Sequence, residues 1–213
     1  MHDNQELVRE IQRTATRKTA GIAKVQGELV RKSLHLLVAM VPILASANLP
    51  ATLALLALGT LFYAFAESSR RQGNPILVVS DLTVIASRDK DKPGFVLGPV
   101  TLGLGAMISL LLYPEPAASI AIYALAFGDG FAALVGSVVG GPRIPLLRGK
   151  TFSGSLACFA AVFVMAYQVS RRPVESLIIA TVAMVLEGVP TGNFDNIIIP
   201  FGVGMVATKL LVP

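Results

Sequence analysis

The chain has 213 residues, of which 54% are hydrophobic and only 15% are charged, with a net charge of +5 and a mean hydropathy of +0.68. This composition excludes a soluble enzyme, a disordered tail and a disulfide scaffold, because too few polar side chains are present. Cys158 is the only cysteine, so the chain cannot form an internal disulfide or a cysteine-rich metal centre.

From Leu34 onward, apolar stretches of about 17 to 23 residues follow one another, each about as long as a crossing of the ~30 Å hydrocarbon core requires. We predict an all-α fold: a polytopic membrane helix bundle of about seven transmembrane helices, with six or eight as alternatives. The predicted spans are residues 34–49, 50–66, 94–112, 117–139, 154–170, 173–189 and 196–212. Residues 1–33 are predicted to form a cytoplasmic amphipathic segment and residues 34–213 a single transmembrane catalytic domain, with residues 76–85 in the membrane interface.

The distribution of Lys and Arg predicts a cytoplasmic N-terminus. In that orientation the inside segments contain 15 of these residues and the outside segments contain three, which is the bias described by the positive-inside rule. The basic excess therefore reports topology and does not indicate a nucleic-acid partner. We expect a multi-pass protein of a prokaryotic cell (inner) membrane, with its active site facing the cytoplasm.

Five ionisable side chains lie in or beside the predicted spans: His35, Glu67, Asp129, Glu187 and Asp195. A charged group near the bilayer centre costs on the order of 3 kcal/mol, so such residues need a partner, an ion or a water-filled cavity. All five fall on the predicted cytoplasmic side. We therefore predict that they form a single polar site there.

Asp129 has a glycine on each side. Gly128 and Gly130 permit a helix break and the close approach of a ligand, and a carboxylate there can hold Mg²⁺ together with a phosphate. The alternative is a packing seam in which Asp129 pairs with a neighbouring basic residue. Gly136 and Gly140 form a small-xxx-small pair that favours close helix packing.

The segment 142–155 combines basic, glycine and hydroxyl residues at the expected start of a helix, where free N–H groups favour an anion such as phosphate. The candidate phosphate-binding residues are Arg148, Gly149, Lys150, Thr151, Ser153, Gly154 and Ser155. A P-loop is excluded, because Ile144 occupies the position of that motif's first glycine. Topology alone explains the basic residues of this loop equally well.

Glu187 and Asp195 surround a Pro/Gly turn at the predicted membrane surface, together with Asn193 and Asn196. Their oxygen atoms are suited to a hard cation or, for the carboxylates, to accepting a proton. A plain interhelical turn, with the Asp and Asn residues capping the next helix, uses the same residue types.

A polar helix face precedes the first predicted span. Glu28, Arg31, Lys32 and His35 are spaced by three and four residues and therefore share one face of a helix. The positive-inside rule and an i,i+4 salt bridge explain why Glu28, Arg31 and Lys32 are present, but they do not explain His35. Two arginines follow Glu67 in the sequence. An alternative interpretation is therefore that Glu67 lies at the end of a helix and that these arginines are its counter-ions.

Together these blocks resemble the dolichol kinase and phytol kinase family, which includes CTP-dependent diacylglycerol kinase and is close to the phosphatidate cytidylyltransferases. The resemblance covers about residues 28–204 and rests on the order and spacing of Glu28 with Arg31-Lys32 and His35, Glu67, Gly128-Asp129-Gly130 with Ala132, Gly136 and Gly140, residues 150–155, and Glu187 with Asp195-Asn196 and Pro200. The family usually reads Lys-Ser-x-Glu-Gly-Ser in the loop. Here Ser153 replaces the glutamate, so Glu67, Glu187 or Asp195 must take its role.

The resemblance implies transfer of the γ-phosphate of CTP, or of ATP or another nucleotide, to the hydroxyl of a membrane alcohol of the polyprenol, dolichol or phytol type, or of diacylglycerol. It is compatible with Mg²⁺ held by Asp129, Asp195 and Glu67, and with nucleotide binding by the loop residues together with Gly128, Gly130, Lys32 and Asn196. The predicted catalytic residues are Glu187, Asp129, Lys150 and His35. Glu187 is the first choice to orient or deprotonate the lipid hydroxyl, and His35 is the second.

Two other functions fit parts of the pattern. A phosphatidate cytidylyltransferase-like enzyme would also use CTP, Mg²⁺ and a lipid. A small ion-coupled transporter would use intramembrane acids, but the predicted outer half of the membrane contains almost no ionisable residue. The sequence does not choose the alcohol, its chain length or the oligomeric state.

Overall fold

The computed structural model describes residues 26–87, 94–142, 144 and 150–212, and over these residues it is helical, without a β-strand. A first helix covers residues 26–38. It is followed by α2 (Val41–Ala47), α3 (Leu49–Arg71), α4 (Leu77–Ala86), α5 (Gly98–Leu112), α6 (Ala117–Tyr123), the π-helix η1 (Ala124–Gly128), α7 (Asp129–Val138), α8 (Phe152–Ser170), α9 (Pro173–Gly188) and α10 (Asp195–Leu211). The predicted all-α fold is confirmed for this part of the chain.

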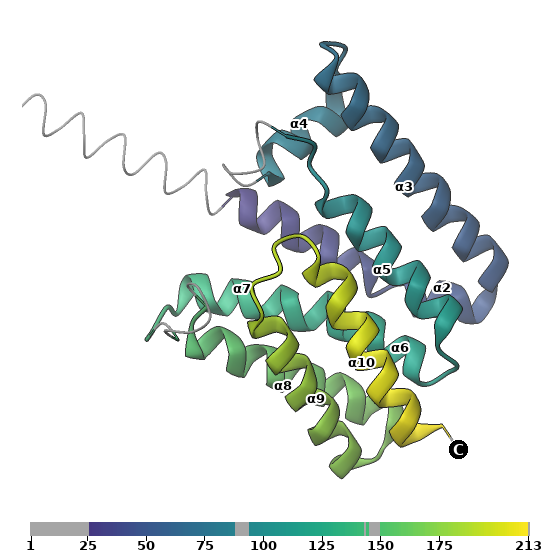
Figure 1. Ribbon diagram of the computed structural model, residues 1–213, viewed down its shortest axis with the longest axis vertical. Helices are drawn as coiled ribbons and strands as arrows, with labels where there is room; N and C mark the ends of the chain where they lie inside the picture. Colours follow the sequence, from purple (N-terminus) through teal and green to yellow (C-terminus); the bar gives the residue numbers. More distant parts are fainter. Residues whose placement is uncertain (1–25, 88–93, 143, 145–149, 213) are drawn as a thin grey trace, which may run out of the picture.

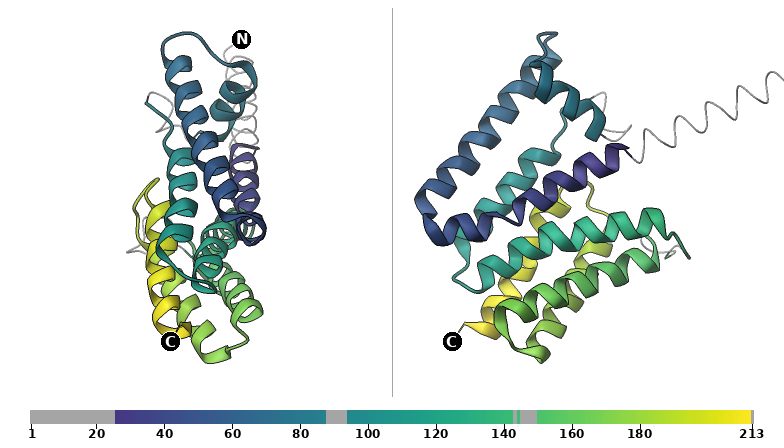
Figure 2. Two further views of the ribbon diagram at one scale, coloured as in Figure 1. Left: turned by 90° about the vertical axis from the view of Figure 1, so that its right-hand side faces the viewer. Right: turned by 180° about the vertical axis from the view of Figure 1, so that it is seen from behind.

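The first helix lies between two groups of helices, with α4 on one side and α7 on the other (Figure 1). Figure 2 shows the same arrangement from behind, and its side view shows that the molecule is narrow in the third direction. One hydrophobic core joins α6 to α10 and includes Ile120 and Ile179. A second core joins the first helix and α2 to α5, α6 and η1, and includes Leu102 and Leu125.

Within the part of the chain that the structure describes, four apolar helical segments are long enough to cross a membrane: Gln26–Ala47, Leu49–Arg71, Ala117–Val138 and Phe152–Ser170. The predicted count of seven spans is not confirmed. Helices α5, α9 and α10 have 15, 16 and 17 residues. At 1.5 Å per residue they extend over about 22–26 Å, which is less than the ~30 Å hydrocarbon core.

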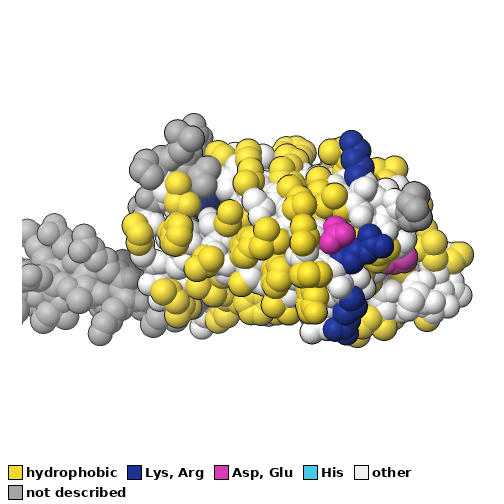
Figure 3. All heavy atoms as spheres, turned by 90° about the horizontal axis from the view of Figure 1, so that it is seen from below, with side chains coloured by type: hydrophobic (Ala, Val, Ile, Leu, Met, Phe, Trp, Pro, Cys, Tyr) yellow, Lys and Arg dark blue, Asp and Glu magenta, His cyan; other side chains and the backbone are white. Residues whose placement is uncertain are grey.

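The outer face of α3 is apolar. Leu55, Leu58, Phe62 and Phe65 are exposed and recur at three- and four-residue spacing, so they form one stripe of the helix. Figure 3, which shows the molecule from below, has hydrophobic side chains over much of this face, with the visible charged side chains mostly toward one side. These apolar helices indicate a membrane protein.

Local sequence signals explain where the first helices begin and end. Pro42 lacks an N–H group, and the chain makes a tight turn at residues 39–40 before α2. Asn48 caps α3, since its side chain accepts a hydrogen bond from the backbone N–H of Ala51 at 2.9 Å. Residues 1–25 of the predicted N-terminal segment lie outside the described residues. The described first helix covers residues 26–38, so the predicted boundary at residue 33 falls inside it.

The helix that carries Asp129 is continuous. Sequence analysis allowed a break at Gly128 and Gly130, but helical structure extends without interruption from Ala117 to Val138. The irregularity that the structure does contain is η1, the π-helical turn immediately before Asp129. Such wide turns are rare and frequently occur at functional sites.

Helices α7 and α8 approach closely at a pair of glycines. A Cβ atom on Gly154 would lie 2.7 Å from the carbonyl oxygen of Ala132 and 3.4 Å from the Cα of Gly136. The partner of Gly136 is therefore Gly154. Gly136 thus contributes to close helix packing as predicted, but Gly140 does not, because it follows the end of α7, has a positive φ of 65° and has no atom near its Cβ position.

Replacing Gly154 with alanine is expected to lower the free energy of unfolding by about 1–3 kcal/mol, because α7 and α8 would have to separate. Gly59→Ala is the control, since Gly59 on α3 has open space around its Cβ position. Thermal unfolding in detergent measures both. Equal melting temperatures for the two variants would contradict the close contact.

Candidate functional site

The first helix and α7 meet through a buried ion pair. Lys32 and His35 are three residues apart and share a helix face, and both point toward Asp129. The Lys32 ammonium donates to Oδ2 of Asp129. Nδ1 of His35 lies 3.2 Å from the same oxygen but makes no hydrogen bond. Lys32 is only 2% exposed, so this pair is fully inside the protein.

A second ion pair joins the segment just before α8 to the end of α9. The Lys150 ammonium donates to Oε1 of Glu187. Glu187 is 2% exposed, and its other carboxylate oxygen, Oε2, is buried without a hydrogen-bond partner. Oγ of Ser155 on α8 is also buried and unpartnered. Unsatisfied buried polar atoms are rare, because each one costs about 1–3 kcal/mol.

The two ion pairs belong to one electrostatic cluster. Lys150 is close enough to Asp129 for a Coulombic interaction, and Cys158 on α8 interacts with both Asp129 and Glu187. Two ammonium groups and two carboxylates therefore lie together inside an apolar bundle. Asp129 and Glu187, far apart in the sequence, thus both interact with Lys150 and Cys158, and a shared functional site stays a prediction.

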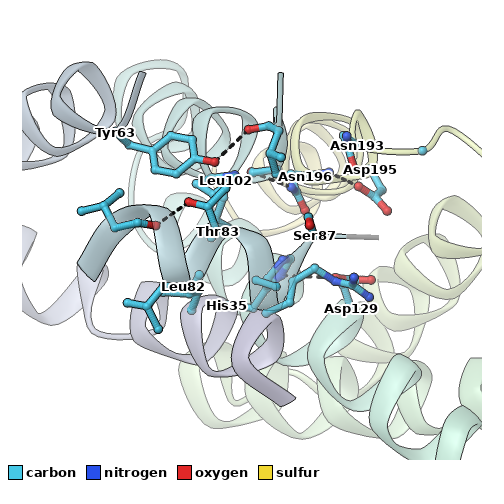
Figure 4. Close-up of a pocket in the computed structure, with 18 residues that line it drawn as sticks. His35, Tyr63, Leu82, Thr83, Ser87, Leu102, Asp129, Asn193, Asp195 and Asn196 are labelled. Atoms are coloured by element: carbon cyan, nitrogen blue, oxygen red, sulfur yellow. Dashed lines mark hydrogen bonds and ion pairs between the residues drawn. The ribbon is translucent and has the colours of Figure 1, made fainter. Parts of the chain in front are cut away.

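The start of α10 contributes to the same region. Asp195 and Asn196 line a pocket together with His35 and Asp129, and so does Asn193 in the preceding turn (Figure 4). The Asn196 amide donates to the carbonyl oxygen of Gly98 at 3.2 Å and to Oγ1 of Thr101 at 3.0 Å. Both of its amide protons are thus used to attach α10 to α5, and nucleotide binding remains a prediction for its oxygen only.

Glu67 does not join this pocket. Its Oε1 accepts from Nη2 of Arg70 at 2.6 Å and from the backbone N–H of Val96 at 3.1 Å, while Oε2 accepts from Nε of Arg70 at 2.7 Å. Both oxygens are therefore engaged in holding α3 to the segment before α5. The predicted role of Glu67 as a metal ligand has no support in this geometry, which matches the alternative of a helix end with its counter-ion.

The predicted phosphate-binding loop is described only from Lys150 onward, since Arg148 and Gly149 lie outside the described residues. The side chain of Thr151 caps α8 by accepting from the Gly154 N–H at 3.2 Å. Ser153 donates to the carbonyl oxygen of Gly140, and the Ser155 N–H donates to the Thr151 carbonyl at 3.1 Å. The backbone groups that were predicted to bind phosphate are therefore largely used within the protein. Of the described side chains, Lys150 pairs with Glu187, and the Ser155 hydroxyl is buried without a hydrogen-bond partner.

The two glycines beside Asp129 have different surroundings. A Cβ on Gly128 would meet Val162 and Cys158 at 3.0 and 3.3 Å, so this glycine allows α8 to pack closely. Gly130 is buried, yet nothing lies within 4 Å of its Cβ position. Only Gly130 therefore leaves room for a ligand beside Asp129.

Whether this region can hold a metal ion depends on the carboxylates that line the pocket. Within the described residues, no group of three or more His, Cys, Asp and Glu side chains is arranged to hold a metal ion. Mg²⁺ in phosphate-transfer sites usually needs fewer protein ligands, since one or two carboxylates suffice when phosphates and water complete its shell. Asp129 and Asp195 line the same pocket, and their binding of Mg²⁺ stays a prediction.

Sequence analysis missed the apolar wall of this pocket. Tyr63 on α3, Leu82 and Thr83 on α4, and Leu102 on α5 line it opposite the acids. The apolar segment 76–85 was recognised as interfacial, but nothing in its spacing indicates which residues it faces. The pocket depends on contacts between helices that are distant in the sequence.

The fold and the site together define a helical membrane protein with a buried cluster of paired charges beside an apolar pocket. The chain is 28% identical over 131 residues to a probable chloroplastic phytol kinase 2 of Glycine max, covering 53% of this chain and 45% of that protein. It is equally similar to a probable chloroplastic phytol kinase of Zea mays, with 43% of that protein covered. The chain thus matches less than half the length of these relatives.

No protein-family model matches the chain, and no solved structure matches it. The two plant relatives support, at most, a place near the phytol and polyprenol kinases. Their names place them in the chloroplast, so the predicted prokaryotic inner membrane is not supported by them.

Proposed function

We propose that this protein is a lipid kinase that transfers the γ-phosphate of a nucleoside triphosphate to the hydroxyl of a membrane isoprenoid alcohol. One observation carries the proposal: His35 and Asp129 lie at the polar end of a pocket whose remaining wall is mostly apolar. Such a pocket suits a molecule with a hydroxyl at the end of a hydrocarbon chain. The similarity to the two probable phytol kinases supports the same reaction.

The structure changes the order of the candidate bases. Glu187 was the first choice from sequence, but it does not line the pocket and is paired with Lys150, whereas His35 does line it. The proposed base is therefore Nδ1 of His35, which is buried without a hydrogen bond. Asp129, 3.2 Å away, would stabilise the imidazolium once the proton has moved.

The remaining charged groups suit the phosphates. Lys150 would bind a phosphate oxygen and exchange its contact with Glu187 for it, and Lys32 would neutralise further charge. Asp129 and Asp195 would hold Mg²⁺, which supplies charge neutralisation for the nucleotide. CTP as the donor and a cytoplasmic site are proposals that come from the family resemblance and from the distribution of Lys and Arg.

The reaction balances with these groups. The alcohol oxygen forms a bond to the γ-phosphorus while the bond from that phosphorus to the β,γ-bridging oxygen breaks. The nucleoside diphosphate leaves with the electron pair of that bond, and the hydroxyl proton moves to His35. The contribution of the protein is to position and neutralise charge, because phosphoryl transfer requires little covalent chemistry from the enzyme.

Two labelled nucleotides test the reaction in purified protein supplied with Mg²⁺ and a C20 isoprenoid alcohol. With γ-³²P-CTP the lipid product is expected to carry the label, and with α-³²P-CTP it is not. The same assay with ATP identifies the donor. Label from α-³²P-CTP in a lipid formed from phosphatidate would instead support a cytidylyltransferase, and ion flux in liposomes without nucleotide would support a transporter.

A further inference from the structure

A cavity of about 220 Å³ lies between the first helix, α3, α4, α5 and the start of α10 (Figure 4). Its two ends differ chemically. His35, Asp129, Asn193, Asp195 and Asn196 form one end, and Figure 4 shows Tyr63, Leu82 and Thr83 on the opposite side. The cavity therefore leads from the charged cluster into an apolar chamber.

The hydroxyl groups in the apolar chamber are already used. Tyr63 donates to the carbonyl oxygen of Val96 at 3.0 Å, and Thr83 donates to that of Val79 at 2.7 Å. Neither hydroxyl has a proton left for a ligand. The wall formed by α4 is otherwise largely apolar and suits carbon chains, and the unpartnered nitrogen of His35 is one of the polar atoms at the other end of the cavity.

Helix α4 separates this chamber from the outside of the bundle. It packs against α3 and touches the first helix where a Cβ on Gly27 would meet the carbonyl oxygen of Ile85. Leu82 lines the chamber and is still 45% exposed, while Val78 on the outer face is 71% exposed. One helix thus stands between the chamber and the surrounding lipid.

We propose that this cavity binds the hydroxyl-bearing end of a long-chain alcohol, with the hydroxyl at His35 and Asp129 and the first carbon atoms against α4. The inference rests on the proposed function, in which it supplies the acceptor site. The cavity is smaller than sites that enclose a whole ligand, which have volumes of about 300–1,000 Å³. The site therefore encloses the end of the chain and leaves the remainder in the membrane.

This placement has a consequence for specificity. Contacts confined to the hydroxyl end cannot distinguish alcohols by total length. Alcohols of 20 carbons and longer polyprenols with the same terminal unit are expected to compete for the site within about threefold of one another, because the additional carbons make no protein contact in the cavity. A methyl ether of the same alcohol is expected to compete at least about tenfold more weakly, since it cannot donate a hydrogen bond to His35 or Asp129.

A photoreactive probe tests the site without nucleotide. The probe is a C20 isoprenoid alcohol with a diazirine next to the hydroxyl-bearing end, added to the detergent-solubilised full chain. Labelled peptides are expected to include residues 77–87 and 94–102. Ala86→Phe, which fills the chamber from α4, is expected to raise the half-saturating probe concentration about tenfold, the equivalent of about two methylene groups no longer buried.

The matched control is Val78→Phe, which adds the same ring to the outer face of α4 and is expected to label like the wild type. If Ala86→Phe fails to fold, Leu82→Ala decides, because it removes an apolar contact without adding bulk and is expected to weaken labelling several-fold. Thermal unfolding establishes that each variant is folded.

The outcomes separate this inference from the proposed function. Labelling that is insensitive to Ala86→Phe and Leu82→Ala, or equal competition by the methyl ether, overturns the acceptor site even if γ-phosphate transfer is found. Labelling as expected in a protein that transfers no phosphate from any nucleotide overturns the kinase proposal and leaves the alcohol-binding site in place.

Discussion

Asp129→Asn is expected to reduce γ-phosphate transfer at least about 100-fold, because the variant loses a charged metal ligand and the counter-ion of His35. The same substitution leaves the ammonium of Lys32 buried without a carboxylate. Removing one partner of a buried ion pair typically destabilises a protein by about 3–5 kcal/mol. Radiolabel incorporation and thermal unfolding in detergent measure the two effects separately.

A double variant separates catalysis from stability. Lys32→Met removes the charge that Asp129→Asn leaves unpaired, so the double variant is expected to regain much of the lost stability. It is not expected to regain activity. Recovery of near-wild-type transfer in the double variant would show that Asp129 serves only as the counter-ion of Lys32, and would refute its role in metal binding.

Lys150→Met is expected to raise the KM for the nucleotide at least about tenfold, because Lys150 is the basic group of the described loop that faces the cluster. Its side chain is 33% exposed, so solvent screens the pair with Glu187. We therefore expect a smaller stability loss than at Lys32, about 2 kcal/mol. Initial rates at varied nucleotide concentration, at a fixed alcohol concentration, measure the effect.

The control for this variant is Lys209→Met, which removes an exposed lysine near the end of α10 and is expected to leave the KM unchanged. The KM of Glu187→Gln for the nucleotide is a second comparison, because glutamine retains a hydrogen-bond acceptor for Lys150. Similar KM values for Lys150→Met and the wild type would remove Lys150 from the phosphate site.

Much of the candidate site was predictable because its residues are exceptions to a simple rule. An acid in an apolar stretch requires a partner, and this identified Asp129 and Glu187 before any contact was known. His35 was recognised for the same reason. The rule does not identify the partner of a buried acid. It therefore gave Glu67 the same weight as Asp129 and Glu187, although Arg70, one helical turn later, neutralises Glu67.

Other expectations failed where they depended on backbone geometry. Gly136 and Gly140 have small-xxx-small spacing, but α7 ends between them, so Gly136 contacts α8 at Gly154 while Gly140 has no atom near its Cβ position. The loop amides expected to bind phosphate are used to cap α8 instead. Spacing along one chain segment does not reveal where a helix ends or which backbone groups a neighbouring turn satisfies.

By itself, the sequence determined the helical membrane character of this protein and the identity of most charged residues in the cluster, because hydropathy and residue type are local properties. Only the tertiary structure decided that Asp129 meets Lys32, 97 residues away, and that Lys150 meets Glu187, 37 residues away. It also decided that apolar residues of α4 line the same cavity as His35. The physical reason is that ion pairs and cavities arise where helices pack against one another, and helix packing depends on surfaces that are brought together only when the whole bundle has formed.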